Sequence, residues 1–221
     1  MENLPEYKNL VEIILTVFTV SESKVKVFLI KKKEDPYKGY WMLPSSMIKV
    51  DEEDKQLINE ILLSQVGLDE VSYEQYGVYT SLDRAVDKRV LGINYVGLIN
   101  STIISLKQEE TLYEGEWFNI DNLPKVAFDN EQVITDSREY LKKKLVNSTV
   151  LKELFPSDFT LPEIQRTYEQ ILETTFDRRN FRKKFINLGL IEDTGYKNES
   201  QTGRPAKLYS FKDEIKERDL F

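Results

Sequence analysis

Two apolar runs near the start of the chain constrain its fold more than any other feature. Residues 11–20, VEIILTVFTV, and residues 24–32, KVKVFLIKK, are rich in β-branched and aromatic residues and are separated by a short polar segment. Runs of this kind joined by a polar connection predict a β-hairpin. Similar runs predict strands at residues 76–82, 89–99 and 115–120. The first part of the chain is therefore expected to be rich in β-sheet.

Helices are expected between and after these strands. Residues 43–68 carry apolar side chains at helical spacing, at Leu57, Ile61, Leu62 and Leu68. Residues 130–146 show the same spacing and end in lysines, which suit the C-terminus of a helix. Strands and helices together predict an α+β fold class.

Length and composition indicate two domains. The chain has 221 residues, of which 40% are hydrophobic and 31% are charged, as in a globular protein with a substantial core. Residues 146–158, which contain Pro156, are the best candidate for a linker, and we expect domains at 1–148 and 149–221. No apolar run approaches 18 residues and the start lacks the regions of a signal peptide, so we expect a cytoplasmic protein without membrane contacts.

The chain has no Cys and no His. Disulfides, thiol nucleophiles, imidazole bases and the usual zinc sites are therefore excluded, and any catalysis would depend on Asp, Glu, Lys or Tyr. We expect neither a bound metal nor another cofactor.

The C-terminal part has a helical pattern of its own. Thr160 and Glu163 form a capping box that places a helix at residues 161–172, and a second helix is expected from Asp177 to Leu188. Two short strands, GLIED and RPAKLYSF, follow on either side of the polar loop TGYKNESQTG. This order predicts a winged helix-turn-helix.

The charge of the second helix favours nucleic acid as a partner. The net charge of the chain is −7, but residues 178–184, RRNFRKK, place five cations in seven positions. Local clustering matters more for phosphate binding than total charge. We expect Arg179, Asn180 and Lys183 near base edges, and the phosphate contacts to come from Arg178, Arg182, Lys184 and the wing residue Arg204. A solvated helix face is the alternative interpretation.

Residues 40–68, which begin YWMLPSS and end at Gly67 and Leu68, resemble the Nudix box. Its pattern is G-x5-E-x7-R-E-U-x-E-E-x-G-U, where U is aliphatic. Aligned on the final glycine, the pattern's first Gly falls on Ser46, its early Glu on Glu52 and its Arg on Glu60.

Three metal-binding carboxylates of that pattern are absent, because the remaining Glu positions fall on Ile61, Ser64 and Gln65. Magnesium is a hard ion that prefers charged oxygen ligands and that diphosphate hydrolysis requires. The acids that remain in the segment, including Glu52, are expected to be solvated. We therefore expect a Nudix-like α/β/α sandwich that has lost its hydrolase activity, with no catalytic residues.

A degenerate Nudix domain followed by a winged helix resembles the NrtR family of transcriptional regulators and its sugar-responsive, AraR-like branch. The resemblance rests on residues 116–130, EWFNIDNLPKVAFDN, and on segments between residues 159 and 211. One departure is Asn130, because these regulators commonly carry His after the FD pair. Residues 83–90, DRAVDKRV, look like the family's Asp/Arg segment beside the ligand pocket, although an ordinary ion pair at a strand end would look the same.

The resemblance implies a homodimeric regulator that binds a palindromic operator in double-stranded DNA and responds to a small molecule. Known effectors are ADP-ribose-type nucleotides in one branch and L-arabinose in another. Since the metal ligands are missing and WMLPSS supplies hydroxyl groups, we expect a pentose, with ADP-ribose as the alternative. The candidate effector-binding residues are Trp41, Ser45, Asp83, Arg84, Arg89 and Asp129, and the expected function is that of a repressor. An active Nudix pyrophosphohydrolase and a protein-binding winged helix remain as alternatives.

Overall fold

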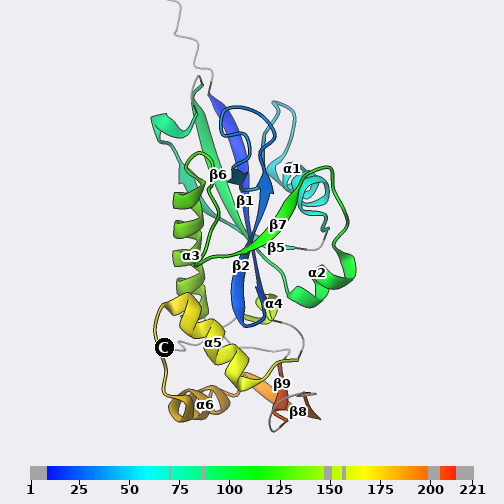
Figure 1. The fold of residues 1–221 in the computed structure, drawn as a ribbon, viewed down its shortest axis with the longest axis vertical. Helices are drawn as coiled ribbons and strands as arrows, with labels where there is room; N and C mark the ends of the chain where they lie inside the picture. Colours follow the sequence, from blue (N-terminus) through cyan, green and yellow to red (C-terminus); the bar gives the residue numbers. More distant parts are fainter. Residues whose placement is uncertain are drawn as a thin grey trace, which may run out of the picture.

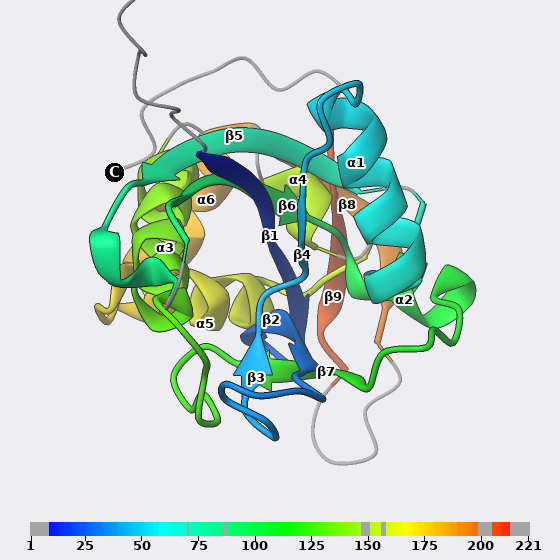
Figure 2. The same ribbon diagram turned by 90° about the horizontal axis from the view of Figure 1, so that it is seen from above.

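A mixed seven-stranded sheet forms the centre of the N-terminal part (Figures 1 and 2). The structure, a computed structural model, describes residues 9–69, 71–85, 88–146, 151–155, 158–198 and 205–212. The sheet has the order β3-β2-β1-β6-β5, with β4 also paired to β1 and β7 to β2. Strands β1 and β6 pair in parallel, and the other pairs between these described strands are antiparallel. Its strands are β1 (Leu10–Ser21), β2 (Lys24–Lys31), β3 (Trp41–Met42), β4 (Ser45–Met47), β5 (Ser72–Tyr79), β6 (Val90–Leu98) and β7 (Gly115–Asn119).

Helices cover both faces of this sheet (Figure 2). Alternate side chains of β1 point to opposite faces, as the strand repeat of two requires. Ile13, Leu15 and Val17 belong to the core under α1 (Asp54–Ile61). Side chains of α2 (Ser101–Lys107) pack against the same core. Ile14 and Phe18 belong to the core under α3 (Asn130–Val146). The expected α/β/α sandwich is confirmed.

The helix of the Nudix-like segment ends in a π-helical turn, Leu62–Val66, which Gly67 terminates. Gly67 has a φ of +79°, a left-handed conformation that glycine adopts without strain. A Cβ atom here would also lie 2.1 Å from the Glu109 carbonyl oxygen. Both reasons explain the glycine that closes the segment.

The C-terminal part forms the expected winged helix-turn-helix. Its elements are α4 (Leu151–Leu154), α5 (Leu161–Leu172), α6 (Arg178–Asn187), β8 (Ile191–Lys197) and β9 (Lys207–Phe211). The predicted capping box at Thr160 and Glu163 is present, and Asp177 caps α6 by accepting from the Asn180 backbone N–H. Phe181 and Phe185 are buried against the ring of Tyr168 on α5.

The apolar core continues from the sandwich into the winged helix. One cluster of buried side chains includes Phe18 of β1 and Leu145 of α3 together with Ile164 and Tyr168 of α5. In Figure 1 the winged helix lies below the end of the sheet where β1 turns into β2. The expected domain boundary at residue 148 lies outside the described residues. No helix in the described ranges is long and apolar enough to span a membrane.

Several sequence-based boundaries were wrong. The strand expected at 76–82 lies at Ser72–Tyr79, because Leu82–Arg84 form a 3-10 turn instead. Residues 194–197 of the expected polar loop belong to β8, which pairs with β9 again at Lys197 after an irregularity in the register. Strands β3 and β4 and helices α2 and α4 were not predicted, since each is too short to show a periodic pattern.

Candidate effector cavity and nucleic-acid interface

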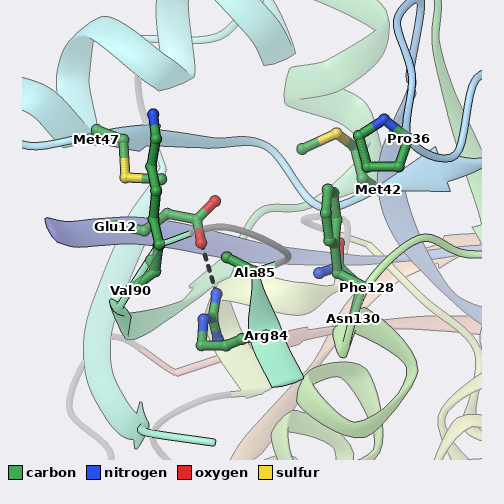
Figure 3. Close-up of a pocket in the computed structure, with 10 residues that line it drawn as sticks. Glu12, Pro36, Met42, Met47, Arg84, Ala85, Val90, Phe128 and Asn130 are labelled. Atoms are coloured by element: carbon green, nitrogen blue, oxygen red, sulfur yellow. Dashed lines mark hydrogen bonds and ion pairs between the residues drawn. The ribbon is translucent and has the colours of Figure 1, made fainter. Parts of the chain in front are cut away.

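A cavity of about 230 Å³ opens beside β1 and β4 (Figure 3). Apolar and aromatic side chains form much of its wall, while an acid and two cations supply charge. It is lined by Glu12, Pro36, Met42, Met47, Arg84, Ala85, Lys88, Val90, Phe128 and Asn130. Such a mixture of apolar walls and a few polar groups is typical of small-molecule sites.

Arg84 is held in this cavity by two carboxylates. Its Nη2 donates to Glu12 Oε2 at 2.6 Å and its Nη1 donates to Asp129 Oδ2 at 2.8 Å. Only 3% of the Arg84 side chain is exposed. The guanidinium lies against Gly92 of β6, where a Cβ atom would approach Arg84 Nη1 to 2.5 Å. The Arg84 guanidinium can occupy this buried position because Gly92 has no side chain.

Two polar atoms of this ion pair lack a hydrogen-bond partner among the described residues. Arg84 Nε and Asp129 Oδ1 are both buried and have no hydrogen-bond partner in the described part of the chain. Arg84 Nε can donate to an anion, and Asp129 Oδ1 can accept from a hydroxyl group. These unsatisfied groups lie at the Arg84 side of the first cavity, where a small shift would let Arg84 Nε reach a polar ligand.

The start of α3 supplies another side of the cavity. Phe128 has a φ of +55°, which is unusual for an aromatic residue and typical of strained functional sites. Two residues later, Asn130 Oδ1 accepts a hydrogen bond of 2.6 Å from the Leu43 backbone N–H. The α3 N-terminus is thereby tied to the segment between β3 and β4.

A second cavity, of about 490 Å³, shares Met42 with the first. Its wall includes three successive lysines, Lys31–Lys33, together with Ser45, Gln65 and Tyr113. Lys31 pairs with Glu114 and Lys33 donates to the Leu112 carbonyl, so their cationic groups are fixed near this cavity. Met42 therefore forms part of the wall of both cavities.

The side chains at the metal positions of the Nudix pattern do not fit a Mg²⁺ cluster. Ile61 is buried in the core, and the Ser64 hydroxyl donates to the Glu60 carbonyl. Gln65 accepts from the Ser45 backbone N–H and donates to the Ser45 carbonyl. Among the described residues no group of three or more acids could hold a metal ion.

The expectation that Glu52 is solvated was wrong. Its side chain is only 5% exposed and accepts a hydrogen bond of 3.1 Å from the Lys49 backbone N–H. Helix α1 begins two residues later, at Asp54, so Glu52 stabilises the loop before the helix.

The structure brings some of the predicted effector residues together. Arg84 lines the first cavity and pairs with Asp129, whereas Ser45 lines the second cavity and donates to Glu12 Oε1 at 2.7 Å. Trp41 lines neither cavity, because its ring packs edge-on against Phe118 at 4.6 Å.

Two further predicted residues occupy less defined places. Arg89 borders neither cavity, although its Nη1 is buried without a hydrogen-bond partner among the described residues. Asp83 lies in the 3-10 turn before Arg84. Glu12 and Phe128 were missed. Glu12 could have been identified, since it is the one charged residue in the run VEIILTVFTV.

The basic face of α6 is exposed over its whole length. Arg178, Arg179, Asn180, Arg182, Lys183 and Lys184 are all exposed, while Phe181 and Phe185 hold the opposite face against α5. The expected amphipathic division of this helix is confirmed. Arg204, the predicted wing contact, lies outside the described residues.

A groove of about 540 Å³ separates α6 from the wing. It is lined by Arg178 and Arg182 of α6 and by Lys197 and Lys207 of the wing strands. Pairing with Asp193 raises the pKa of Lys207, while the nearby charge of Arg182 acts to lower it. Lys197 was not among the predicted site residues, because only the tertiary fold shows that it faces α6.

Comparison with known proteins matches both parts of the chain. Residues 151–211 match the family model described as the NrtR DNA-binding winged helix domain. The "ADPR responsive transcriptional repressor NtrR" of Acinetobacter baylyi is 28% identical over 207 residues, covering 91% of this chain and 82% of the relative. An ADP-ribose pyrophosphatase of Methanocaldococcus jannaschii is 31% identical over 134 residues, covering 61% of this chain and 78% of the relative.

A solved structure shares the whole arrangement. Shewanella oneidensis NrtR, crystallised with a 27mer DNA, superposes with a TM-score of 0.76 and 27% identity over 91% of this chain and 93% of that protein. The similarity spans the sandwich, the winged helix and the order in which they follow. Residues 151–211 therefore form a winged helix of the NrtR type, and the whole chain is similar to Nudix-related, winged-helix transcriptional regulators.

Proposed function

We propose that the chain is a transcriptional repressor that binds operator DNA through α6 and releases it when ADP-ribose enters the Nudix-like part. The observation that carries the proposal is the buried Arg84, whose Nε lacks a partner among the described residues beside a cavity with sugar-compatible acceptors. Domains at 1–148 and 149–221 are part of this proposal. The family match, which begins at residue 151, supports that division.

ADP-ribose suits the cavities better than a pentose. The first cavity, at about 230 Å³, lies below the range of roughly 300–1,000 Å³ that is usual for ligand sites, but the second adds about 490 Å³. We infer that an elongated ligand passes Met42 and occupies both cavities. Two relatives act on or respond to ADP-ribose, which supports the nucleotide over the L-arabinose expected from the sequence.

Cations would take the place of a metal at the diphosphate. Arginine binds phosphate oxygens through paired hydrogen bonds and lysine binds them as a point charge. Among the described residues Arg84 has one unpaired donor, its Nε, and Lys88 and the three lysines Lys31–Lys33 line the two cavities. Since Ile61, Ser64 and Gln65 supply no carboxylate, we propose that the ligand is bound and released without hydrolysis.

We propose that some side chains of the basic face of α6 contact bases and others contact phosphates. Arg179, Asn180 and Lys183 would contact base edges in the major groove, and the groove that includes Lys197 and Lys207 would hold a phosphate. Arg178, Arg182, Lys184 and Arg204 would add phosphate contacts. A homodimer that binds a palindromic operator remains part of the proposal, by analogy with two-fold symmetric winged-helix regulators.

Calorimetry and operator-binding titrations test the effector. ADP-ribose should bind the full chain and lower its operator affinity, whereas L-arabinose at the same concentration should do neither. Lys88→Ala should weaken ADP-ribose binding, while Lys143→Ala, an exposed lysine on α3, serves as the matched control. Binding of L-arabinose but not of ADP-ribose would reject the assignment.

A further inference from the structure

Arg138 of α3 joins three parts of the molecule at the base of the winged helix. Its Nη2 donates to the carbonyl of Gln170 on α5 at 2.7 Å. Its Nη1 lies 3.0 Å from Asp121 Oδ1, in the loop after β7, and 3.3 Å from Glu173 Oε1. The Arg138 side chain is only 16% exposed, although its partners Asp121 and Glu173 are about half exposed. One guanidinium therefore binds the sandwich loop, the end of α5 and the turn that follows.

Glu173 is the residue at which α5 ends and the turn toward α6 begins. Its backbone is left-handed, with a φ of 52° and a ψ of 42°, which is unfavourable for a residue with a Cβ atom. Lys142, one helical turn beyond Arg138, also binds its carboxylate. The hydrogen bond from Lys142, followed by the charge of Arg138, lowers the pKa of Glu173. Two cations of α3 thus hold the strained turn that leads into the recognition helix.

Gln170 adds a second polar connection across the same junction. Its Oε1 accepts from the Val25 backbone N–H, at the start of β2. Its Nε2 donates to Asn119 Oδ1 at 3.0 Å and to Asp121 Oδ2 at 2.7 Å. The end of α5 is therefore fixed to both the sheet and α3.

The other end of α3 lies in the effector cavity. Asn130 lines that cavity and binds the Leu43 N–H, and the preceding Asp129 binds Arg84. From Asn130 to Arg138 the helix rises by about 12 Å at roughly 1.5 Å per residue. Figure 1 shows α3 running without interruption alongside the sheet down to α5. A ligand that shifts the α3 N-terminus must therefore act on the residues that hold the α5–α6 turn.

We propose that Arg138 is a positioning residue through which occupancy of the effector cavity controls the placement of α6. The proposal rests on the proposed function, because it requires a ligand in the cavity at Asn130. With Arg138 in place, the operator-binding arrangement of α5 and α6 depends on the position of α3. Without it, the carboxylate of Glu173 keeps only Lys142 as a partner on α3, and the effect of ligand binding on DNA binding should be much weaker.

The test compares operator affinity with and without saturating ADP-ribose, using the full chain. In the wild-type protein the two dissociation constants should differ by a factor of roughly 5 to 150, the usual range of allosteric coupling. In Arg138→Gln the factor should fall below about two, while ADP-ribose affinity without DNA stays within about threefold. Lys143→Ala, five residues along the same helix, should keep the wild-type factor. An unchanged factor in Arg138→Gln would overturn the role.

A second variant tests the same role in case Arg138→Gln does not fold. Glu173→Gly removes the carboxylate but keeps the left-handed turn, which glycine adopts freely. It should fold at least as well as the wild type and lose the coupling in the same way. Retention of the wild-type factor in Glu173→Gly would contradict the inference. If the wild-type protein binds no ADP-ribose, both the proposed effector and the role of Arg138 are rejected. If it binds ADP-ribose and the variants keep the wild-type factor, only the role of Arg138 is rejected.

Discussion

Gly92→Ala should destabilise the sandwich through Arg84, although alanine is normally the better strand residue. The new Cβ would lie 2.5 Å from Arg84 Nη1 and 2.6 Å from Cζ, so the guanidinium must move. Arg84 is buried and its hydrogen bonds to Glu12 and Asp129 are charge-assisted. Loss of one such bond costs about 1.5–3 kcal/mol.

The opposing effect is small. Gly92 does not have a positive φ, so alanine fits its backbone and gains about 0.5–1 kcal/mol over glycine. We expect a net loss of about 1–2 kcal/mol in the free energy of unfolding from these two magnitudes. For a chain of this length, each kcal/mol shifts the melting temperature by about 2–4 °C.

A double-mutant cycle isolates the cause. Both tryptophans, Trp41 and Trp117, lie in the sandwich, so tryptophan fluorescence during urea unfolding reports on that part. In an Arg84→Ala background, Gly92→Ala should become neutral or stabilising by up to about 1 kcal/mol. Equal destabilisation in both backgrounds would show that Arg84 is not what the new side chain meets, and the reasoning would be refuted.

Four other changes separate the roles assigned above. Arg179→Ala should weaken specific operator binding by about 1–3 kcal/mol in fluorescence anisotropy and leave scrambled DNA almost unaffected. Lys184→Ala should weaken binding to both duplexes alike and reduce the slope of log K against log salt by about one. Burial raises the pKa of Tyr95 to about 12 from its usual 10. The contribution of this group to stability is complete below pH 10 and should be lost as the pH rises to 12. In unfolding measured against pH, Tyr95→Phe should not show this loss. Gln65→Glu should lower stability by about 1–3 kcal/mol, because a carboxylate cannot donate to the Ser45 carbonyl, and should yield no Mg²⁺-dependent AMP release from ADP-ribose.

The long periodic elements could be predicted from the sequence, because their signals are local. The capping box at Thr160 fixed the start of α5, and the spacing of Phe181 and Phe185 fixed the buried face of α6. The cavity could be predicted only in part. Arg84 and Asp129 were expected near it, but Glu12 reaches them from β1, 72 residues before Arg84 in the chain. No local pattern could show that Gly92 leaves room for the guanidinium of Arg84.

Trp41 was predicted to bind the effector because an aromatic ring can stack against a ligand, but it does not line the cavity. An aromatic ring beside a polar segment suits either a ligand or a core. The pairing of β3 with β2, at Trp41 and Lys31, carries the ring toward Phe118 instead of the cavity. Strand register decided between the two possibilities, and register depends on pairing partners that are distant in the chain.

The degenerate Nudix segment shows how a hydrolase scaffold can serve as a sensor. A sensor must release its ligand unchanged, so the carboxylates that would gather Mg²⁺ against a diphosphate are a disadvantage. Here Gln65 both accepts from and donates to the Ser45 backbone, a double contact that needs an amide and excludes a carboxylate. The same residue therefore fixes the wall of the second cavity and removes a metal ligand. Ile61, at the end of α1, is buried in the core, so an acid at this position would bury an unpaired charge and lower the stability of the fold.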